Sequence, residues 1–244
     1  MKWPFRTQPA IGPIQHGYAI CTVPRSGSNF VGQVLASTGT LGKPLEYFNG
    51  PGRRHFEDPT YPDEPELQVG RILSDGATPN GIYALKLFPF QLDAVQDKIR
   101  WTKLLPELHF VYLVRRDLVG QALSWSRAIQ TVQYRHDQKP QAVANYDASH
   151  IMKCLHDIAR LNARWEVYFA ANCISPLKLV YEDILANPQH GVAEVARLVG
   201  LGATPQADMS KITVQRQSDD LSEQWRGQFL LDAGNRDRIS ELML

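Results

Sequence analysis

A short segment rich in hydrogen-bond donors, P-R-S-G-S at residues 24–28, separates two patterned stretches near the start of the chain. The preceding Gly17–Val23 is an apolar run typical of a buried strand, and apolar residues recur at helical spacing over Asn29–Ser37. The free N–H groups and the dipole of a helix start attract anions, and the Arg25 guanidinium adds donors. Gly27 permits an unusual loop conformation and close approach by a ligand. The segment predicts an anion-binding loop, with an ordinary capped helix start as the alternative.

This loop lacks the residues that bind a nucleoside triphosphate. The pattern G-x-x-x-x-G-K-[ST] is absent, because no Lys follows Gly27 and residue 22 is Thr. No pair of acidic residues and no cluster of His or Cys predicts a metal site. A small-molecule kinase of the P-loop type is therefore an alternative interpretation that lacks its usual lysine and metal ligands.

A second segment combines a strand-like run, basic residues and a helix. The sequence V-Y-L-V-R-R-D-L-V-G-Q-A-L-S-W spans residues 111–125, and Arg116 stands where the strand should end. Ser124 follows eight residues later, about two turns along the expected helix, which Asp117 would cap. A guanidinium and a hydroxyl that converge in this way suit a second phosphate group. Taken alone, the same residues also fit surface charges and a serine on a helix face.

Strand-like and helix-like segments alternate along the chain. Short apolar runs predict strands at Gly17–Val23, Ile82–Leu87, His109–Val114 and Leu177–Tyr181. Helical spacing predicts helices at Leu118–Ile129 and in a long amphipathic segment from Ile151 to Phe169. The alternation favours βαβ units and hence an α/β fold of three layers, P-loop-like, with a central, mainly parallel sheet flanked by helices.

Length and composition fit one globular domain over residues 1–244. Hydrophobic residues make up 43%, and 26 Lys and Arg oppose 25 Asp and Glu, so no net field attracts nucleic acid. Two long polar insertions, near residues 49–81 and 134–147, are expected to rim the site or to be plain surface loops. Three cysteines without a C-x-x-C pair, and the lack of a signal or membrane-length apolar run, favour a reducing, cytoplasmic location.

The two phosphate motifs together resemble those of sulfotransferases that use 3′-phosphoadenosine-5′-phosphosulfate (PAPS). In that family the first loop binds the 5′-phosphosulfate, and the R-x7-S motif binds the 3′-phosphate. Y-E-D at residues 181–183 resembles a motif whose Tyr lies near the adenine, and residues 214–225 resemble an Arg-containing donor loop. The resemblance implies PAPS as the donor, no metal, and the following donor-binding residues: Arg25, Ser26, Gly27, Ser28, Asn29, Arg116, Ser124, Tyr181 and Arg216.

The closer resemblance is to bacterial carbohydrate sulfotransferases of the trehalose 2-sulfotransferase type. They share R-S-G-S, G-x-P-x-E-[YF]-F, R-R-D and R-Q-[SA]-D-x-L-x-E-x-W, which occur here in the same order. This resemblance implies a carbohydrate or glycolipid acceptor and a homodimer. The catalytic His of animal cytosolic sulfotransferases is missing, because Phe88 stands in its place, and the bacterial pattern offers Glu46 instead.

Sulfuryl transfer depends on positioning and on charge stabilisation, as phosphoryl transfer does. The catalytic residues implied are Arg25, Lys86 and Glu46. Arg25 and the loop amides would stabilise the leaving phosphate. Lys86, at the end of a strand, would reach the same region, or would only extend to solvent at the sheet edge.

Glu46 is the candidate general base for the acceptor hydroxyl. Its neighbours Leu45, Tyr47 and Phe48 are apolar, which predicts a raised pKa and aromatic surface for a sugar. A surface carboxylate, or one that only binds the sugar, is the alternative. The presence of Glu46 also speaks against a nucleotide-binding protein without catalytic activity.

Overall fold

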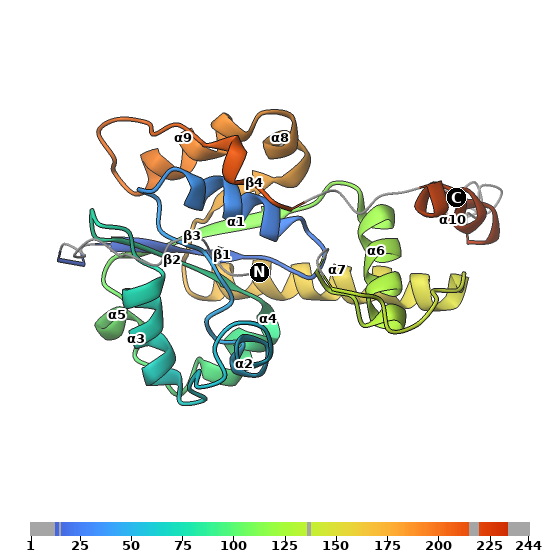
Figure 1. The fold of residues 1–244 in the computed structure, drawn as a ribbon, viewed down its shortest axis with the longest axis horizontal. Coiled ribbons are helices and arrows are strands. Elements are labelled where there is room, and N and C mark those ends of the chain that lie inside the picture. Colours follow the sequence, from blue (N-terminus) through green and yellow to red (C-terminus); the bar gives the residue numbers. More distant parts are fainter. Residues whose placement is uncertain (1–12, 15, 136–137, 215–219, 234–244) are drawn as a thin grey trace. The chain divides into compact units, whose positions relative to one another are not determined.

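The computed structural model describes residues 13–14, 16–135, 138–214 and 220–233 (Figure 1). The chain divides into two compact units. Of the described residues, the sheet unit comprises those up to 116 and those in 162–214, and the helical unit comprises those in 117–161 and in 220–233. The expectation of a single domain over residues 1–244 stays a prediction.

Parallel strands form the sheet of the sheet unit, in the order β2-β1-β3-β4. Their bounds are His16–Cys21 for β1, Ile82–Leu87 for β2, Leu108–Val114 for β3 and Leu177–Val180 for β4. Each strand coincides with a predicted one to within two residues at either end. The prediction of an α/β fold with a central parallel sheet is therefore confirmed.

The carboxyl ends of three strands lie at one edge of this sheet. Cys21 of β1 pairs with Leu87 of β2 on one side and with Tyr112 of β3 on the other. The order of strands changes direction at β1, and ligands of such sheets bind at the carboxyl ends near that point. The segments that follow β1, β2 and β3 are thus the expected surroundings of a site.

Helices cover both faces of the sheet. One face packs against α1 (Ser28–Ser37), α8 (Tyr181–Ala186) and α9 (Pro188–Leu198), and the C-terminal part of α7 (Ala148–Ala171) lies against the other (Figure 1). Successive side chains of β3 point to opposite faces of the sheet, so they contact different layers of helices. Val111 belongs to a buried cluster with residues of α1 and α9, whereas the Tyr112 ring lies 5.5 Å from that of Phe169 in α7.

Residues 49–81, expected as an irregular insertion, fold mostly into two helices, α2 (Gly50–Phe56) and α3 (Pro65–Asp75). Each has a proline in its first turn, where a missing N–H costs no hydrogen bond. Asn49 caps α2 by accepting a hydrogen bond from the N–H of Gly52 at 3.1 Å. The prolines therefore mark helix starts. The described residues between 132 and 147 contain no helix or strand.

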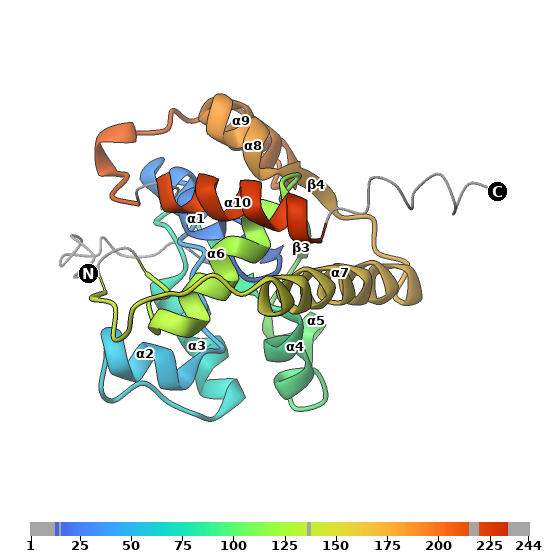
Figure 2. The same cartoon turned by 90° about the vertical axis from the view of Figure 1, so that its right-hand side faces the viewer.

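The sheet unit also contains α4 (Pro89–Val95), α5 (Trp101–Leu104) and a short 3-10 helix, η1 (Met209–Lys211). The helical unit contains α6 (Leu118–Thr131), the N-terminal part of α7 and α10 (Asp220–Asp232). α10 packs against α6 (Figure 2), and its Trp225 and Phe229 side chains are buried. No helix among the described residues is long and apolar enough to cross a membrane.

Candidate active site

The loop after β1 is held from within the sheet unit by buried hydrogen bonds. The Thr22 hydroxyl donates to the Leu113 carbonyl oxygen at 2.8 Å and lies 2.7 Å from the hydroxyl of Ser26, which is fully buried. The indole N–H of Trp165 donates to the Thr22 carbonyl oxygen at 2.8 Å. The base of the loop is thereby tied to β3 and to α7.

Two residues of this loop have left-handed backbone conformations. φ is 60° at Arg25 and 85° at Gly27, and the helical hydrogen bonds of α1 begin where the N–H of Phe30 donates to the Gly27 carbonyl oxygen at 3.0 Å. Left-handed residues that lead into a helix start turn successive N–H groups toward one point, where an anion can bind. A Cβ at Gly27 would lie 2.1 Å from Cδ2 of Tyr181, so glycine is needed there. This geometry fits the predicted anion loop.

Arg115, at the end of β3, lies at the loop, although the sequence pattern pointed to Arg116. The Arg115 guanidinium donates to the Arg25 carbonyl oxygen at 3.2 Å and lies 5.6 Å from the centre of the Tyr181 ring. Its side chain is only 17% exposed. Tyr181, expected near an adenine, is thus adjacent to both Arg115 and Gly27. Arg115 is a candidate phosphate ligand that the sequence patterns did not single out.

Three residues, namely Arg116, Ser124 and Arg216, were expected to bind a 3′-phosphate, and the structure describes the first two. Arg116 is 62% exposed, and its guanidinium pairs with Asp183 at 2.5 Å. Ser124 is half-buried on α6 of the helical unit. Arg216 lies outside the described residues. A shared role of Arg116, Ser124 and Arg216 in phosphate binding stays a prediction.

A buried lysine connects the first turn of α1 to the candidate base. The Lys86 side chain is 4% exposed, and its ammonium lies 3.0 Å from Oε1 of Glu46 and 2.5 Å from Oδ1 of Asn29. The Phe88 ring covers it, with the ring centre 5.7 Å from Nζ. Lys86 therefore points into the protein beside the loop and does not extend to solvent at the sheet edge.

Glu46 is fixed beside β2 by backbone and side-chain contacts. The backbone N–H of Lys86 donates to the Leu45 carbonyl oxygen at 2.8 Å, which ties this segment to the strand. Oε2 of Glu46 accepts hydrogen bonds from Asn49 at 3.2 Å and from Gln91 at 3.1 Å. The Glu46 side chain is 25% exposed, so the cluster around it is not fully closed to solvent.

The prediction of a raised pKa for Glu46 is wrong. Burial alone would raise the pKa, but the charge and hydrogen bond of Lys86, together with hydrogen bonds from Asn49 and Gln91, lower it below the ordinary value. The aromatic neighbours of Glu46 in sequence, Tyr47 and Phe48, are buried in the core. Glu46 is consequently ionised at neutral pH.

Asn49 and Gln91 are two further residues that the sequence patterns did not connect with the site. Asn49 immediately precedes α2, and Gln91 is the third residue of α4. Polar side chains at such positions cap helices, so a local signal for them existed. That signal does not reveal that the same two amides also reach Glu46.

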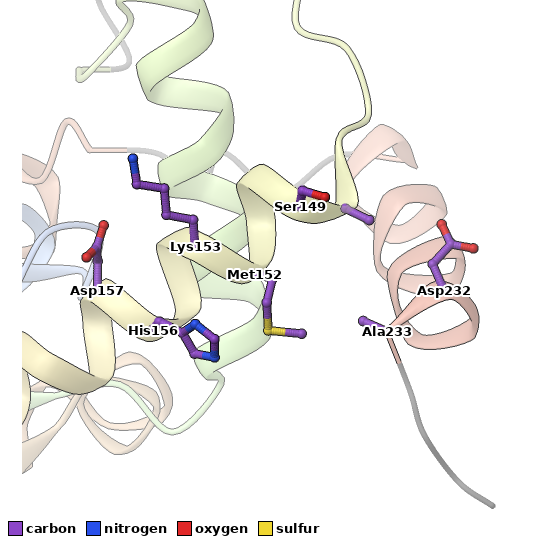
Figure 3. A pocket seen from close by; sticks show the side chains of 8 residues that line it. Ser149, Met152, Lys153, His156, Asp157, Asp232 and Ala233 are labelled. Atoms are coloured by element: carbon purple, nitrogen blue, oxygen red, sulfur yellow. The ribbon is translucent and has the colours of Figure 1, made fainter. Parts of the chain in front are cut away.

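A pocket of about 470 Å³ lies in the helical unit, between the start of α7 and the end of α10 (Figure 3). Met152, Lys153, His156 and Asp232 are among its lining residues, and none of the predicted site residues lines it. Across the described part of the chain, no group of three or more His, Cys, Asp or Glu is placed to hold a metal ion. The candidate site is therefore the loop after β1 together with the cluster around Glu46.

Comparison with known proteins points to one family. The sequence profile of the Stf0 sulphotransferases matches residues 17–232. Trehalose 2-sulfotransferases of Mycobacterium tuberculosis and Mycolicibacterium smegmatis are each 26% identical to this chain, over 88% of it and 95% of their own length. A solved sulfotransferase domain from the Curacin biosynthetic pathway aligns with 89% of this chain and 98% of its own, with a TM-score of 0.45 and 14% identity.

Proposed function

The chain belongs to the Stf0 sulfotransferase family, and from this we propose that it transfers a sulfuryl group from PAPS to a hydroxyl of a carbohydrate. One observation supports the proposal most directly: buried Lys86 contacts both Asn29, in the first turn after the anion loop, and Glu46. Groups suited to the donor and to the acceptor are thereby adjacent, as direct in-line transfer requires. Trehalose, the sugar in the names of the two mycobacterial relatives, is the first acceptor to test.

The residues around the loop fit the phosphosulfate end of this donor. The left-handed backbone at Arg25 and Gly27 leads into the start of α1, and this arrangement supplies N–H groups for the 5′-phosphosulfate. Arg115 adds a nearly buried guanidinium, and Tyr181 offers a ring for the adenine. PAPS supplies an activated sulfuryl group that carries less charge than a terminal phosphate, so its transfer needs no metal.

Two oppositely charged residues have separate tasks at the reacting atoms. Glu46, which is ionised at neutral pH, takes the proton of the acceptor hydroxyl and makes the oxygen a better nucleophile. Lys86, held by Asn29, stabilises the negative charge that develops on the leaving phosphate oxygen, together with Arg25 and the loop N–H groups.

Transfer of radiolabelled sulfate from PAPS to trehalose tests the proposal. Labelled trehalose is the expected product. Labelling of another sugar but not of trehalose would correct the acceptor. If no hydroxyl compound from a panel of sugars and glycolipids is labelled, the proposed function is wrong.

The two adjacent arginines should differ in their effect on donor binding. Arg115→Ala is expected to weaken the binding of adenosine-3′,5′-bisphosphate by on the order of 2–5 kcal/mol, because its guanidinium is nearly buried at the loop. Arg116→Ala should have a smaller effect, because that side chain is 62% exposed and paired with Asp183. Calorimetry on the two variants measures the difference. A larger loss of binding in Arg116→Ala than in Arg115→Ala would indicate that Arg116 is the phosphate ligand.

Sulfate transfer should proceed at an unchanged rate in EDTA. The expectation follows from the low charge of the transferred group and from the absence of the P-loop lysine motif in the sequence. The measurement is the initial rate with PAPS before and after chelation. Activity that disappears with EDTA and returns with magnesium would favour the kinase interpretation.

A further inference from the structure

Two helix-capping amides meet at one oxygen of Glu46. Asn49 accepts from the N–H of Gly52 with Oδ1 at 3.1 Å and donates with Nδ2 to Oε2 of Glu46 at 3.2 Å. Gln91 accepts from the N–H of Phe88 with its own Oε1 at 3.0 Å and donates with Nε2 to the same Glu46 oxygen at 3.1 Å. Each amide therefore links the start of a helix, α2 or α4, to the carboxylate.

The helix starts determine which end of each amide faces Glu46. A backbone N–H only donates, so it must meet the amide oxygen, and the NH2 end is left to point at the carboxylate. Gln91 is 3% exposed, so water cannot easily replace either of its partners. Folding of α2 and α4 thus prepares two donors for Glu46 before any ligand binds.

The hydrogen bonds are distributed unequally over the two oxygens of Glu46. Oε2 accepts from Asn49 and from Gln91, whereas the described residues offer Oε1 one donor, Lys86. A carboxylate oxygen has two lone pairs, so Oε2 is saturated and Oε1 keeps one position for a further donor. The hydroxyl of an acceptor is such a donor.

We propose that Asn49 and Gln91 are positioning residues that fill Oε2 of Glu46 and leave Oε1 as the atom that receives the acceptor's proton. The inference rests on the proposed function. In the transfer step the acceptor O–H bond breaks, its proton binds Oε1, and the acceptor oxygen forms a bond to sulfur. The bond from sulfur to the phosphate oxygen breaks, and its electron pair stays on that oxygen. Negative charge thus leaves Glu46 and appears on the phosphate, with Lys86 beside Oε1 throughout.

The two amides also act on the charge of Glu46. Burial disfavours the ionised carboxylate, and Lys86, on β2, is the charged group that offsets this effect together with Asn49 and Gln91. Replacing either amide NH2 by an oxygen removes a hydrogen bond to the charged form, so the pKa of Glu46 should rise. A base works only when deprotonated. If the pKa of Glu46 rises, the loss of activity on acidification should therefore begin at a higher pH.

Asn49→Asp and Gln91→Glu test this arrangement without removing the helix caps. One carboxylate oxygen still accepts from the helix N–H, and the other faces Oε2 of Glu46 as a repulsive neighbour. The titration of Glu46 can be followed by NMR of protein labelled at the glutamate carboxyl carbons, with the Glu46 signal assigned from its absence in Glu46→Gln. In both variants the titration midpoint of Glu46 should be raised by at least about one pH unit. Asn49→Ser, which caps without adding charge, should raise it less.

Asn187→Asp is the matched control for these variants. Asn187 caps α9 by accepting from the N–H of His190 at 3.3 Å, so the change is chemically the same at another helix start. The Glu46 midpoint should not move in this variant. An unmoved midpoint in Asn49→Asp and Gln91→Glu, or an equal shift in Asn187→Asp, overturns the proposal.

The pH dependence of kcat/KM gives the functional readout. In Asn49→Asp and Gln91→Glu its acid limb should move upward with the NMR midpoint, and the rate should recover at high pH. Damage to the structure alone would lower the rate at every pH, and that result would count against a positioning role. If the wild-type protein transfers no sulfate, the proposed function fails, while the NMR midpoints still decide whether the amides control Glu46.

Discussion

Replacing Glu46 by Gln should lower kcat by about 10²–10⁴-fold and leave donor binding near its wild-type strength. Gln keeps the shape of the side chain but cannot take the acceptor's proton. Because the pKa of Glu46 is lowered, the wild-type residue is ionised at neutral pH, and the full contribution of the base is lost there. The wild-type rate itself should decline only in acid, as the pH falls through this lowered pKa.

Glu194→Gln is a suitable control for this variant. Glu194 has the same exposed fraction as Glu46, 25%, and it also forms an ion pair, with Arg197 of α9 at 2.7 Å. Its replacement should leave kcat unchanged. Calorimetry with adenosine-3′,5′-bisphosphate checks donor binding in both variants. A Glu46→Gln protein with wild-type kcat would remove Glu46 from the mechanism and make Lys86 the next residue to test as a base.

Replacing Lys86 by Met should lower kcat by about 10²–10³-fold and destabilise the fold by on the order of 3 kcal/mol. The rate falls because no ammonium is left to stabilise charge on the leaving phosphate oxygen. The fold is destabilised because a largely buried carboxylate loses the partner that lies 3.0 Å from it. Urea unfolding and steady-state kinetics measure the two effects separately.

The pH dependence of unfolding shows whether the loss of stability in Lys86→Met comes from Glu46. A carboxylate with a lowered pKa stabilises the folded state above its unfolded pKa, and this stabilisation is lost as the pH falls through the folded value. Without Lys86 the pKa of Glu46 rises. The destabilisation should therefore be greatest at neutral pH and should shrink in acid, where Glu46 takes up a proton.

The double variant Lys86→Met with Glu46→Gln provides the control. Lys86→Met should cost less free energy of unfolding in the Glu46→Gln background, because no buried charge is then left without its partner. An equal cost in both backgrounds would mean that the lysine stabilises the fold through contacts other than the ion pair.

Local patterns in the sequence were sufficient to predict the sheet and the loop between β1 and α1, and anion binding by that loop stays a prediction. Each apolar run of strand length can be recognised from a few consecutive residues, and so can the P-R-S-G-S segment. The strands are parallel and end at a common edge, and this brings the segments after β1, β2 and β3 to one side of the sheet. The helices within residues 49–81 were not predicted, because proline and glycine mark turns as well as helix starts.

The surroundings of Glu46 and the different positions of the Arg115 and Arg116 side chains were decided by the tertiary structure. The residues next to Glu46 in sequence are apolar, but the groups around its carboxylate include Lys86 and Gln91, which are far away along the chain. A pKa depends on charges and donors within a few ångströms, whatever their separation in sequence, so the shift has the opposite sign to the one predicted. Arg115 and Arg116 are neighbours of the same type, and only the packing at the end of β3 turns the first toward the loop and the second toward Asp183.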